Sequence, residues 1–157
     1  MNKEYRFYNY EQCFAYYANQ VMNIRQAKIK GEVILAKPAF LVAVANGIDE
    51  GVFAENRFIL SEWLERRYSL LMKKYTAKSQ FSEVTGIEKP FWHLSTDGFW
   101  HLNCKVKAPE GMTPSKKWLK DNVEYAYLDD DLWVLLQNQE WRKKVSEFII
   151  EKKLTQH

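Results

Sequence analysis

Histidines, cysteines and clustered carboxylates are the residues of this 157-residue chain whose chemistry could support catalysis or metal binding. Two of its three histidines, His93 and His101, are close in sequence, and its only cysteines are Cys13 and Cys104. A structural zinc site needs paired Cys or His ligands at short spacing. His101 and Cys104 have no second pair to complete such a set. We therefore expect neither a metal site nor a cofactor.

The densest group of carboxylates is the run Asp129, Asp130 and Asp131. This run could bind a divalent ion, but acidic residues just before an apolar stretch are more typical of a helix N-terminus. The chain contains no Gly-rich phosphate-binding loop, no nucleophile-elbow motif and no HExxH motif. The sequence favours a protein that is not an enzyme and has no catalytic residues.

The basic residues indicate a different kind of partner. The net charge is only +3, so the chain is not a polybasic tail. Basic residues are nevertheless concentrated, with six between Arg57 and Lys78 against two Glu, and five between Lys105 and Lys120 against one Glu. Local basic patches on a near-neutral protein are compatible with nucleic-acid binding, although most charged runs are simply solvated faces.

The segment 91–102 repeats Phe-Trp-His-Leu on either side of Asp97-Gly98. Asp-Gly between two aromatic runs predicts a β-hairpin, because this pair tolerates the positive φ angles of a tight turn. A loop of two or of four residues gives the same two faces. The first face carries Phe91, His93, Trp100 and Leu102, and the second carries Trp92, Leu94, Phe99 and His101. Either both faces are buried, or one is a partly exposed aromatic surface.

Helices are predicted to position these residues. One is expected over residues 10–29 and ended by Gly31, a second from Lys37-Pro38 to Gly51, and a third over 62–75 after Ser61. In the third helix, Arg67 and Lys74 either extend along the apolar stripe or face a polyanion. Ser115, the Asp129–Asp131 run and Asn138 are candidate N-caps of later helices.

These elements predict an α+β fold: a predominantly helical single domain over residues 1–157, with a small antiparallel hairpin or sheet around residues 90–104. Residues 1–30 are charged throughout, unlike a signal peptide. The longest uncharged run, residues 38–48, is well short of the ~20 residues that span a bilayer. With two cysteines and no CxxC spacing, we expect a cytoplasmic protein.

Two motifs resemble those of a known family. Lys37-Pro38-Ala39-Phe40-Leu41 opens an apolar helix, and Pro90-Phe91-Trp92-His93-Leu94 is followed by Gly98-Phe99-Trp100. Over residues 35–153 the chain is similar to the sulfur-binding, DNA phosphorothioate-sensing domain that precedes HNH nuclease modules in modification-dependent restriction enzymes. It departs from the better-known members before Pro-Phe, where they carry Tyr-His-Pro-x-Tyr and this chain has residues 84–89.

The resemblance implies a DNA-binding specificity module of a bacterial restriction or defence system. In that family, backbone contacts position the domain, and a shallow pocket of Pro, aromatic and aliphatic groups receives the sulfur. The implied partners are double-stranded DNA, plain or modified, and a separate nuclease, since no nuclease module follows Leu154. The candidate DNA contacts are Lys37, Pro38, Arg57, Lys74, Lys78, Lys89, Pro90, His93 and His101, with Phe91 and Trp100 as scaffold.

Two other functions are compatible with the same residues. The first is a non-enzymatic protein-interaction or dimerisation domain that uses the aromatic hairpin face. The second, which the sequence favours least, is a divergent nuclease whose metal-dependent cleavage would need His93 or Asp97.

Overall fold

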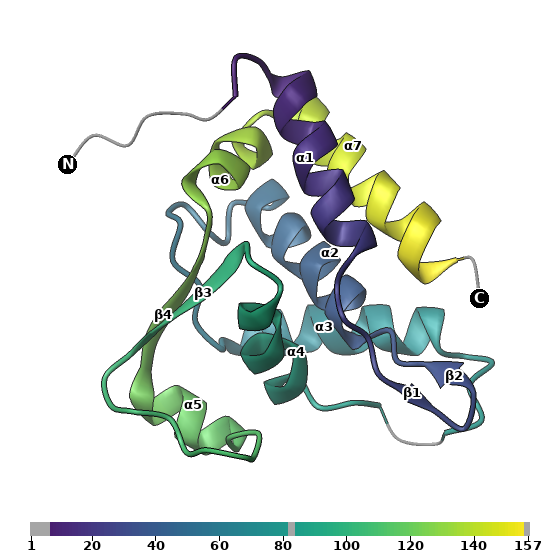
Figure 1. Cartoon of the computed structure of the whole chain (residues 1–157), viewed down its shortest axis with the longest axis vertical. Coiled ribbons are helices and arrows are strands. Elements are labelled where there is room, and N and C mark those ends of the chain that lie inside the picture. The colour runs from purple at the N-terminus through teal and green to yellow at the C-terminus, as the bar shows by residue number, and fades with distance from the viewer. Residues whose placement is uncertain (1–6, 82–83, 156–157) are drawn as a thin grey trace.

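The computed structural model describes residues 7–81 and 84–155. Helices dominate these two ranges, and four short strands form two separate antiparallel pairs (Figure 1). The elements are, in chain order, α1 (Tyr10–Met22), β1 (Lys28–Ile29), β2 (Glu32–Val33), α2 (Ala36–Asp49), α3 (Glu62–Tyr75), α4 (Glu88–His93), the 3-10 turn η1 (Leu94–Thr96), β3 (Trp100–Cys104), α5 (Lys116–Asn122), β4 (Val123–Leu128), α6 (Asp130–Gln137), α7 (Gln139–Ile149) and the π-helical turn η2 (Ile150–Leu154). The predicted α+β class with a helical majority is confirmed.

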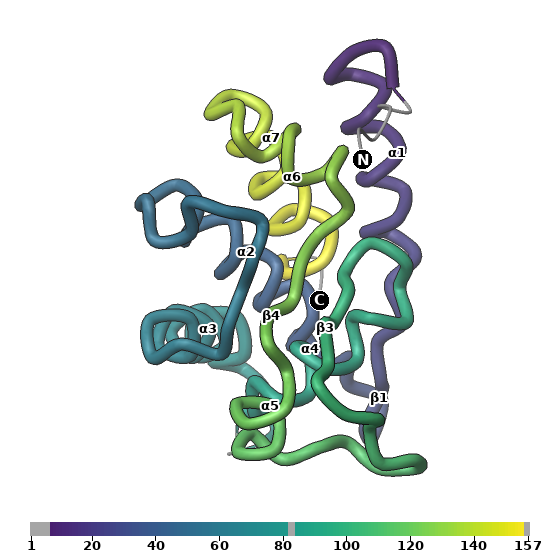
Figure 2. Tube along the Cα trace, turned by 90° about the vertical axis from the view of Figure 1, so that its left-hand side faces the viewer, coloured from purple at the N-terminus to yellow at the C-terminus, as the bar shows by residue number. Residues whose placement is uncertain are grey.

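Helix α2 is the centre of the fold because it is apolar on every side and buried along almost its whole length. Helices α3, α4, α6 and α7 all contact it. Seen from the side, α2 and α3 lie on one side of the molecule and α1 with β1 on the other, with β3 and β4 between them (Figure 2). None of the described helices is long and apolar enough to cross a membrane.

Three predicted helix caps are confirmed. The side chains of Ser61, Ser115 and Asn138 accept hydrogen bonds from backbone N–H groups in the first turns of α3, α5 and α7, at 3.2, 3.1 and 3.1 Å. Asp129 also occupies an N-cap position, before α6. Its carboxylate, however, binds the Tyr17 hydroxyl at 2.8 Å and the His101 ring at 2.6 Å. The acidic run therefore connects α6 to α1 and β3.

The predicted helix over residues 10–29 is too long. Helix α1 ends at Met22, and the last two residues of the predicted helix form β1, which pairs with β2 in a hairpin. The hairpin turn is Lys30-Gly31, whose φ angles of 52° and 81° are those of a two-residue turn between paired strands. A second helix starting near Pro38 and a third over 62–75 are confirmed within one or two residues.

The predicted hairpin over residues 91–102 is wrong, and so are its two faces. The first half of the segment belongs to α4 and η1, and only the second half is a strand. Gly98 has a φ of 95°, so the turn is present, but β3 pairs with β4, where Trp100 lies opposite Leu128. Pro90 favours the first turn of a helix, and the distant β4 supplies the hydrogen-bonding partner of β3.

Three aromatic rings of the segment, those of Phe91, Phe99 and Trp100, are buried in one core, whereas Trp92 is half-buried. Trp100 packs edge-to-face on Phe40 and Phe91, with ring centroids 5.2 and 5.7 Å apart, and its indole N–H donates to the Phe91 carbonyl at 2.9 Å. Such ring pairs add roughly 0.5–1.5 kcal/mol beyond their buried area. Phe91 and Trp100 are thus scaffold, and the exposed aromatic face needed for the protein-docking alternative is not formed.

Candidate nucleic-acid interface

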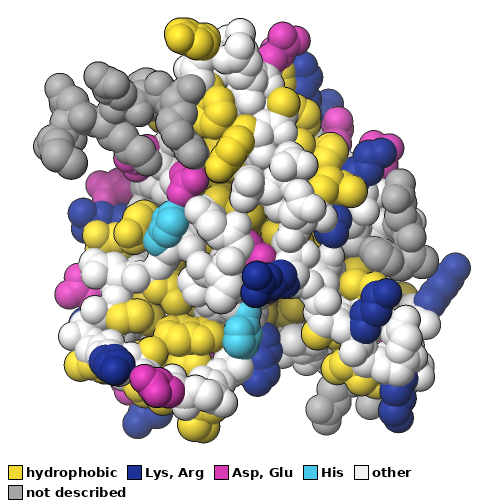
Figure 3. All heavy atoms as spheres, in the orientation of Figure 1, with side chains coloured by type: hydrophobic (Ala, Val, Ile, Leu, Met, Phe, Trp, Pro, Cys, Tyr) yellow, Lys and Arg dark blue, Asp and Glu magenta, His cyan; other side chains and the backbone are white. Residues whose placement is uncertain are grey.

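A pocket of about 570 Å³ opens beside α4, on the face shown in Figure 3. Three segments line it: the chain before and within the β1–β2 hairpin, the start of α2, and residues 85–96. Its residues are Arg25, Gln26, Ala27, Ile29, Ile34, Ala36, Lys37, Thr85, Lys89, Pro90, His93 and Thr96. Four of the candidate contacts predicted from the sequence, Lys37, Lys89, Pro90 and His93, therefore lie together.

Helix α4 explains why three of these residues share one wall. Pro90 and Lys89 precede His93 by three and four positions, so all three side chains lie on the same helix face. Pro90 lacks an N–H, and it sits in the first turn, where helix N–H groups have no intrahelical partner. Next to this wall, the buried Tyr68 hydroxyl of α3 donates to the Thr85 carbonyl at 2.7 Å. This hydrogen bond holds in place the loop around Thr85, which lines the pocket.

Asp97 joins the other segments of the pocket. Its carboxylate lies 2.6 Å from the Lys37 ammonium, and the Lys37 and Asp97 side chains are only 12% and 3% exposed. The same carboxylate accepts the backbone N–H of Arg25 at 3.0 Å. Asp97 thus ties the start of α2 and the loop after α1 to the turn before β3. Because Lys37 already has a carboxylate partner, it contributes less free positive charge to the pocket than its position suggests.

His93 stands at the pocket edge, where its Nε2 lies 2.8 Å from the Thr113 hydroxyl oxygen. Partial burial, and after it the cations Lys37 and Lys89, lower the pKa of His93 below its usual value near 6.5. These surroundings favour the neutral imidazole over the imidazolium. The free positive charge at the rim comes from Arg25 and Lys89, which take part in no ion pair within residues 7–81 and 84–155.

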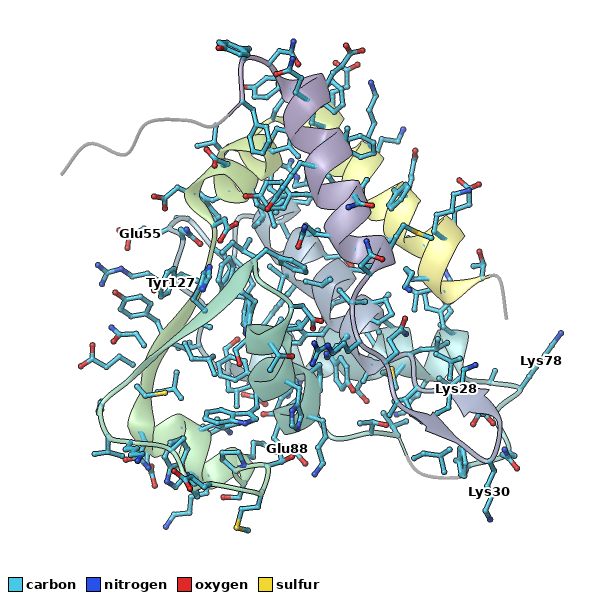
Figure 4. All side chains as sticks on the ribbon, viewed as in Figure 1. Lys28, Lys30, Glu55, Lys78, Glu88 and Tyr127 are labelled. Carbon is cyan, nitrogen blue, oxygen red and sulfur yellow. The ribbon has the colours of Figure 1, made fainter. Side chains whose placement is uncertain are left out.

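The other five candidates do not line this pocket. Pro38 is buried in α2. Arg57 stacks on the Tyr125 ring at 4.6 Å, and His101 is paired with Asp129, so both belong to the surface of the β3–β4 pair. Lys74 and Lys78 lie at the end of α3 and just after it, and Lys78 points away from the ribbon (Figure 4).

The sequence analysis missed the part of the pocket contributed by Arg25, Gln26, Ile29 and Ile34, because these residues fell within or beside the overlong first helix. A local signal was present. Gly31 lies between the β-branched residues Ile29 and Val33, and a glycine between short β-prone stretches marks a turn. The contribution of Asp97 was also missed, since its carboxylate acts across 60 residues of sequence on Lys37.

The arrangement is suited to binding an anion. Within the part of the chain that the structure describes, no three His, Cys, Asp or Glu side chains are close enough to hold a metal ion. The pocket combines aliphatic walls with a proline ring, an imidazole and unpaired cations at its rim. Such a site fits an anion that carries a weakly hydrated, polarizable group.

The chain is similar to several known proteins. A family model for the ScoMcrA-like DNA sulfur-binding domain matches residues 18–157. The sulfur-binding domain of ScoMcrA complexed with phosphorothioated DNA has a TM-score of 0.66 to this chain at 22% identity, covering 87% of this chain and 86% of that domain. The sulfur-binding domain of SprMcrA complexed with phosphorothioated DNA has a TM-score of 0.64 at 16% identity, covering 91% and 86%.

A longer structure matches as well. The Type IV phosphorothioation-dependent restriction endonuclease ScoMcrA has a TM-score of 0.65 at 22% identity, covering 87% of this chain. This chain corresponds to only 29% of that enzyme's length. No curated protein matches the chain.

Proposed function

The chain belongs to the family of ScoMcrA-like DNA sulfur-binding domains, and on that premise we propose that it binds duplex DNA and senses a backbone phosphorothioate at the pocket around Pro90. The observation that carries the proposal is the pocket itself. It brings Lys37 from one family-like motif together with Pro90 and His93 from the other, and with the neighbouring Lys89, around aliphatic walls. Both isolated domains that resemble this chain are described in complex with phosphorothioated DNA.

The chemistry of the pocket favours sulfur over oxygen. A sulfur atom in place of a non-bridging phosphate oxygen is larger, more polarizable and less strongly hydrated. Moving it out of water against Pro90, Ile34 and Ala36 therefore costs less than moving an oxygen there. The ammonium of Lys89 and the guanidinium of Arg25 at the rim would hold the charge that remains on the phosphate.

Asp97 contributes to this selectivity by neutralising Lys37. A fully unpaired ammonium deep in the pocket would attract a smaller, harder phosphate oxygen at least as strongly as the sulfur, because the oxygen can approach more closely. With Lys37 and Asp97 2.6 Å apart, the pocket interior is close to neutral and the cations act at its edge. Phosphate contacts then position the domain, while the apolar interior selects the modification.

We place cleavage outside this domain. The described side chains include no candidate metal cluster, and the chain spans 29% of the related restriction endonuclease. The role that fits is a specificity module that delivers a separate nuclease module or partner to modified DNA. A cytoplasmic location follows from this role, because the DNA to be inspected lies there.

The test compares two duplexes of the same sequence, one of which carries a single phosphorothioate. We expect the domain to bind the modified duplex about tenfold more tightly or better, as followed by fluorescence anisotropy at moderate salt. Pro90→Ala should reduce this preference because it removes part of the apolar wall. Pro109→Ala, in the loop before α5 and outside the pocket lining, is the matched control and should leave it unchanged.

The outcomes separate the two parts of the proposal. Equal affinity for the two duplexes would remove sulfur sensing and leave general DNA binding. No binding of either duplex at micromolar protein would overturn the proposed function altogether.

A further inference from the structure

The cations of this protein divide into two groups. Many of those far from the β1–β2 hairpin are paired with carboxylates, as in Lys116 with Glu65 at 2.6 Å and Arg142 with Asp49 at 2.8 Å, although Arg57, Lys105 and Lys117 take part in none of the described ion pairs. Seven cations near the β1–β2 hairpin form no ion pair with any residue in the ranges 7–81 and 84–155. They are Arg25, Lys28, Lys30, Lys73, Lys74, Lys78 and Lys89.

Two of these cations, Lys28 and Lys30, lie on the hairpin, which is exposed to solvent. Residues 27–31 are all exposed, and even the apolar Ile29 is 47% exposed. Figure 4 shows Lys28 and Lys30 on the hairpin and Lys78 beyond it, all at the same corner of the molecule. In Figure 3 dark-blue side chains gather over this corner. The hairpin's one carboxylate, Glu32, accepts the backbone N–H of Gln80 at 3.2 Å.

The backbone at the tip of the hairpin is strained at Lys30. Lys30 has a φ of 52°, in the left-handed region that costs a residue with a Cβ roughly 1 kcal/mol relative to glycine. Asn or Asp would fit this turn position better. The turn is therefore less stable than it would be with Asn or Asp, and the Lys30 side chain at its tip is exposed to a partner.

The hairpin is also continuous with the pocket around Pro90. Ile29 and Ile34 line that pocket on one side and a second hollow of about 660 Å³ on the other. Lys89 lines both, and the end of α3 with Lys73 forms the far wall of the second hollow. The hairpin is thus a ridge between two adjoining hollows, both with lysine at their walls.

We infer that the β1–β2 hairpin, through Lys28 and Lys30, is a second DNA contact that holds the phosphate backbone of the same duplex whether or not sulfur is present. The inference rests on the proposed function, since the pocket must first place the domain on DNA. A two-stranded ribbon is narrow enough to enter a major groove about 12 Å wide. The flexible ammonium groups act as point charges without the planar fork of arginine, so they contact phosphates without reading sequence.

The test uses the double variant Lys28→Gln/Lys30→Gln, with the plain and the phosphorothioated duplex, over about 50 to about 300 mM salt. Each phosphate contact contributes roughly 0.9 to the slope of log affinity against log salt. We expect the slope to fall by about 2 and the affinity for both duplexes to fall by the same factor, about tenfold at low salt. The ratio between the duplexes should not change.

The matched control is Lys143→Gln/Lys144→Gln on α7, which removes the same charge from lysines that are paired with Glu147 and Glu140. It should leave the slope unchanged. If the hairpin variant keeps the wild-type slope while the wild-type protein still prefers sulfur, the hairpin inference fails and the proposed function stands. A loss confined to the phosphorothioated duplex would instead make the hairpin part of sulfur selection and overturn the inference.

Discussion

The tetrapeptide Phe-Trp-His-Leu occurs at residues 91–94, in α4 and η1, and again at 99–102, leading into and along β3. Both phenylalanines are buried in the core. The tryptophans differ: Trp100 is fully buried among Phe40, Phe58 and Phe91, whereas Trp92 is half-buried and packs edge-to-face on Trp118 at 5.9 Å. The same four residues thus place His93 at the pocket from a helix in one copy, and place Trp100 in the core from a strand in the other.

The two copies of the tetrapeptide differ most in the partners of their histidines. His101 is bound to the Asp129 carboxylate, which also holds Tyr17, so its ring connects β3 to α1 and α6. His93 lies at the pocket edge between Lys37 and Lys89 and near Thr113. A side chain therefore becomes structural or available to a ligand through its partners, which come from distant parts of the chain.

The largest expected difference between the copies is in stability. Trp100→Ala should lower the free energy of unfolding by about 3–5 kcal/mol, because it leaves a cavity among buried rings and an unpaired Phe91 carbonyl. Trp92→Ala should cost about 1–2 kcal/mol, since part of that side chain already meets solvent. Urea unfolding measures both. If Trp100→Ala does not fold, Trp100→Phe, which keeps most of the apolar volume, gives the comparison. Equal losses at the two positions would contradict the difference in burial.

The histidines should differ by a smaller amount. His101→Ala removes a partner from the partly buried Asp129 carboxylate, and we expect a loss of about 1–3 kcal/mol. His93→Ala, at an exposed position, should change the free energy of unfolding by no more than about 0.5 kcal/mol. Thermal and urea unfolding of the two variants side by side would check this order, and a larger loss for His93→Ala would reverse our assignment of roles.

The smallest expected effect is the pH dependence of DNA binding. Partial burial, followed by Lys37 and Lys89, lowers the pKa of His93 in the free protein, and a phosphate nearby would raise it again by favouring the imidazolium. Binding then takes up a proton, so affinity should rise as the pH falls from about 7.5 to about 5.5, by up to about tenfold for each unit of pKa difference. Anisotropy titrations across this range measure the effect. His93→Gln should flatten the dependence and His101→Gln should retain it; equal profiles for both variants would show that His93 does not meet the phosphate.

The contrast between the copies also shows what the sequence could predict. Helix α3 and the caps Ser61, Ser115 and Asn138 were predictable because each depends on residues within one turn. The turn at Gly98 was predictable for the same reason. The partner of β3 was not, because β4 begins only at Val123 and the local pattern allowed a nearer partner.

The pocket was predictable only in part, and for a related reason. Lys37 and Pro90 stood out in family-like motifs. The wall formed by Arg25 and Ile29 depends on where α1 ends, and the periodic apolar pattern of the sequence did not mark that point. The pairing of Asp97 with Lys37 depends on the folded chain bringing two distant segments together, which no local pattern encodes.

The bonds of Asp97 to Lys37 and to the Arg25 backbone have a kinetic consequence. They hold the pocket walls in place before any nucleic acid arrives, so little conformational entropy is lost on association. Diffusion and orientation then set the rate of encounter, which should be alike for modified and unmodified sites. Discrimination would appear in residence time, because among closely related complexes affinity varies mainly through the dissociation rate. A domain built this way can sample many ordinary sites briefly and remain at the rare one whose backbone fits.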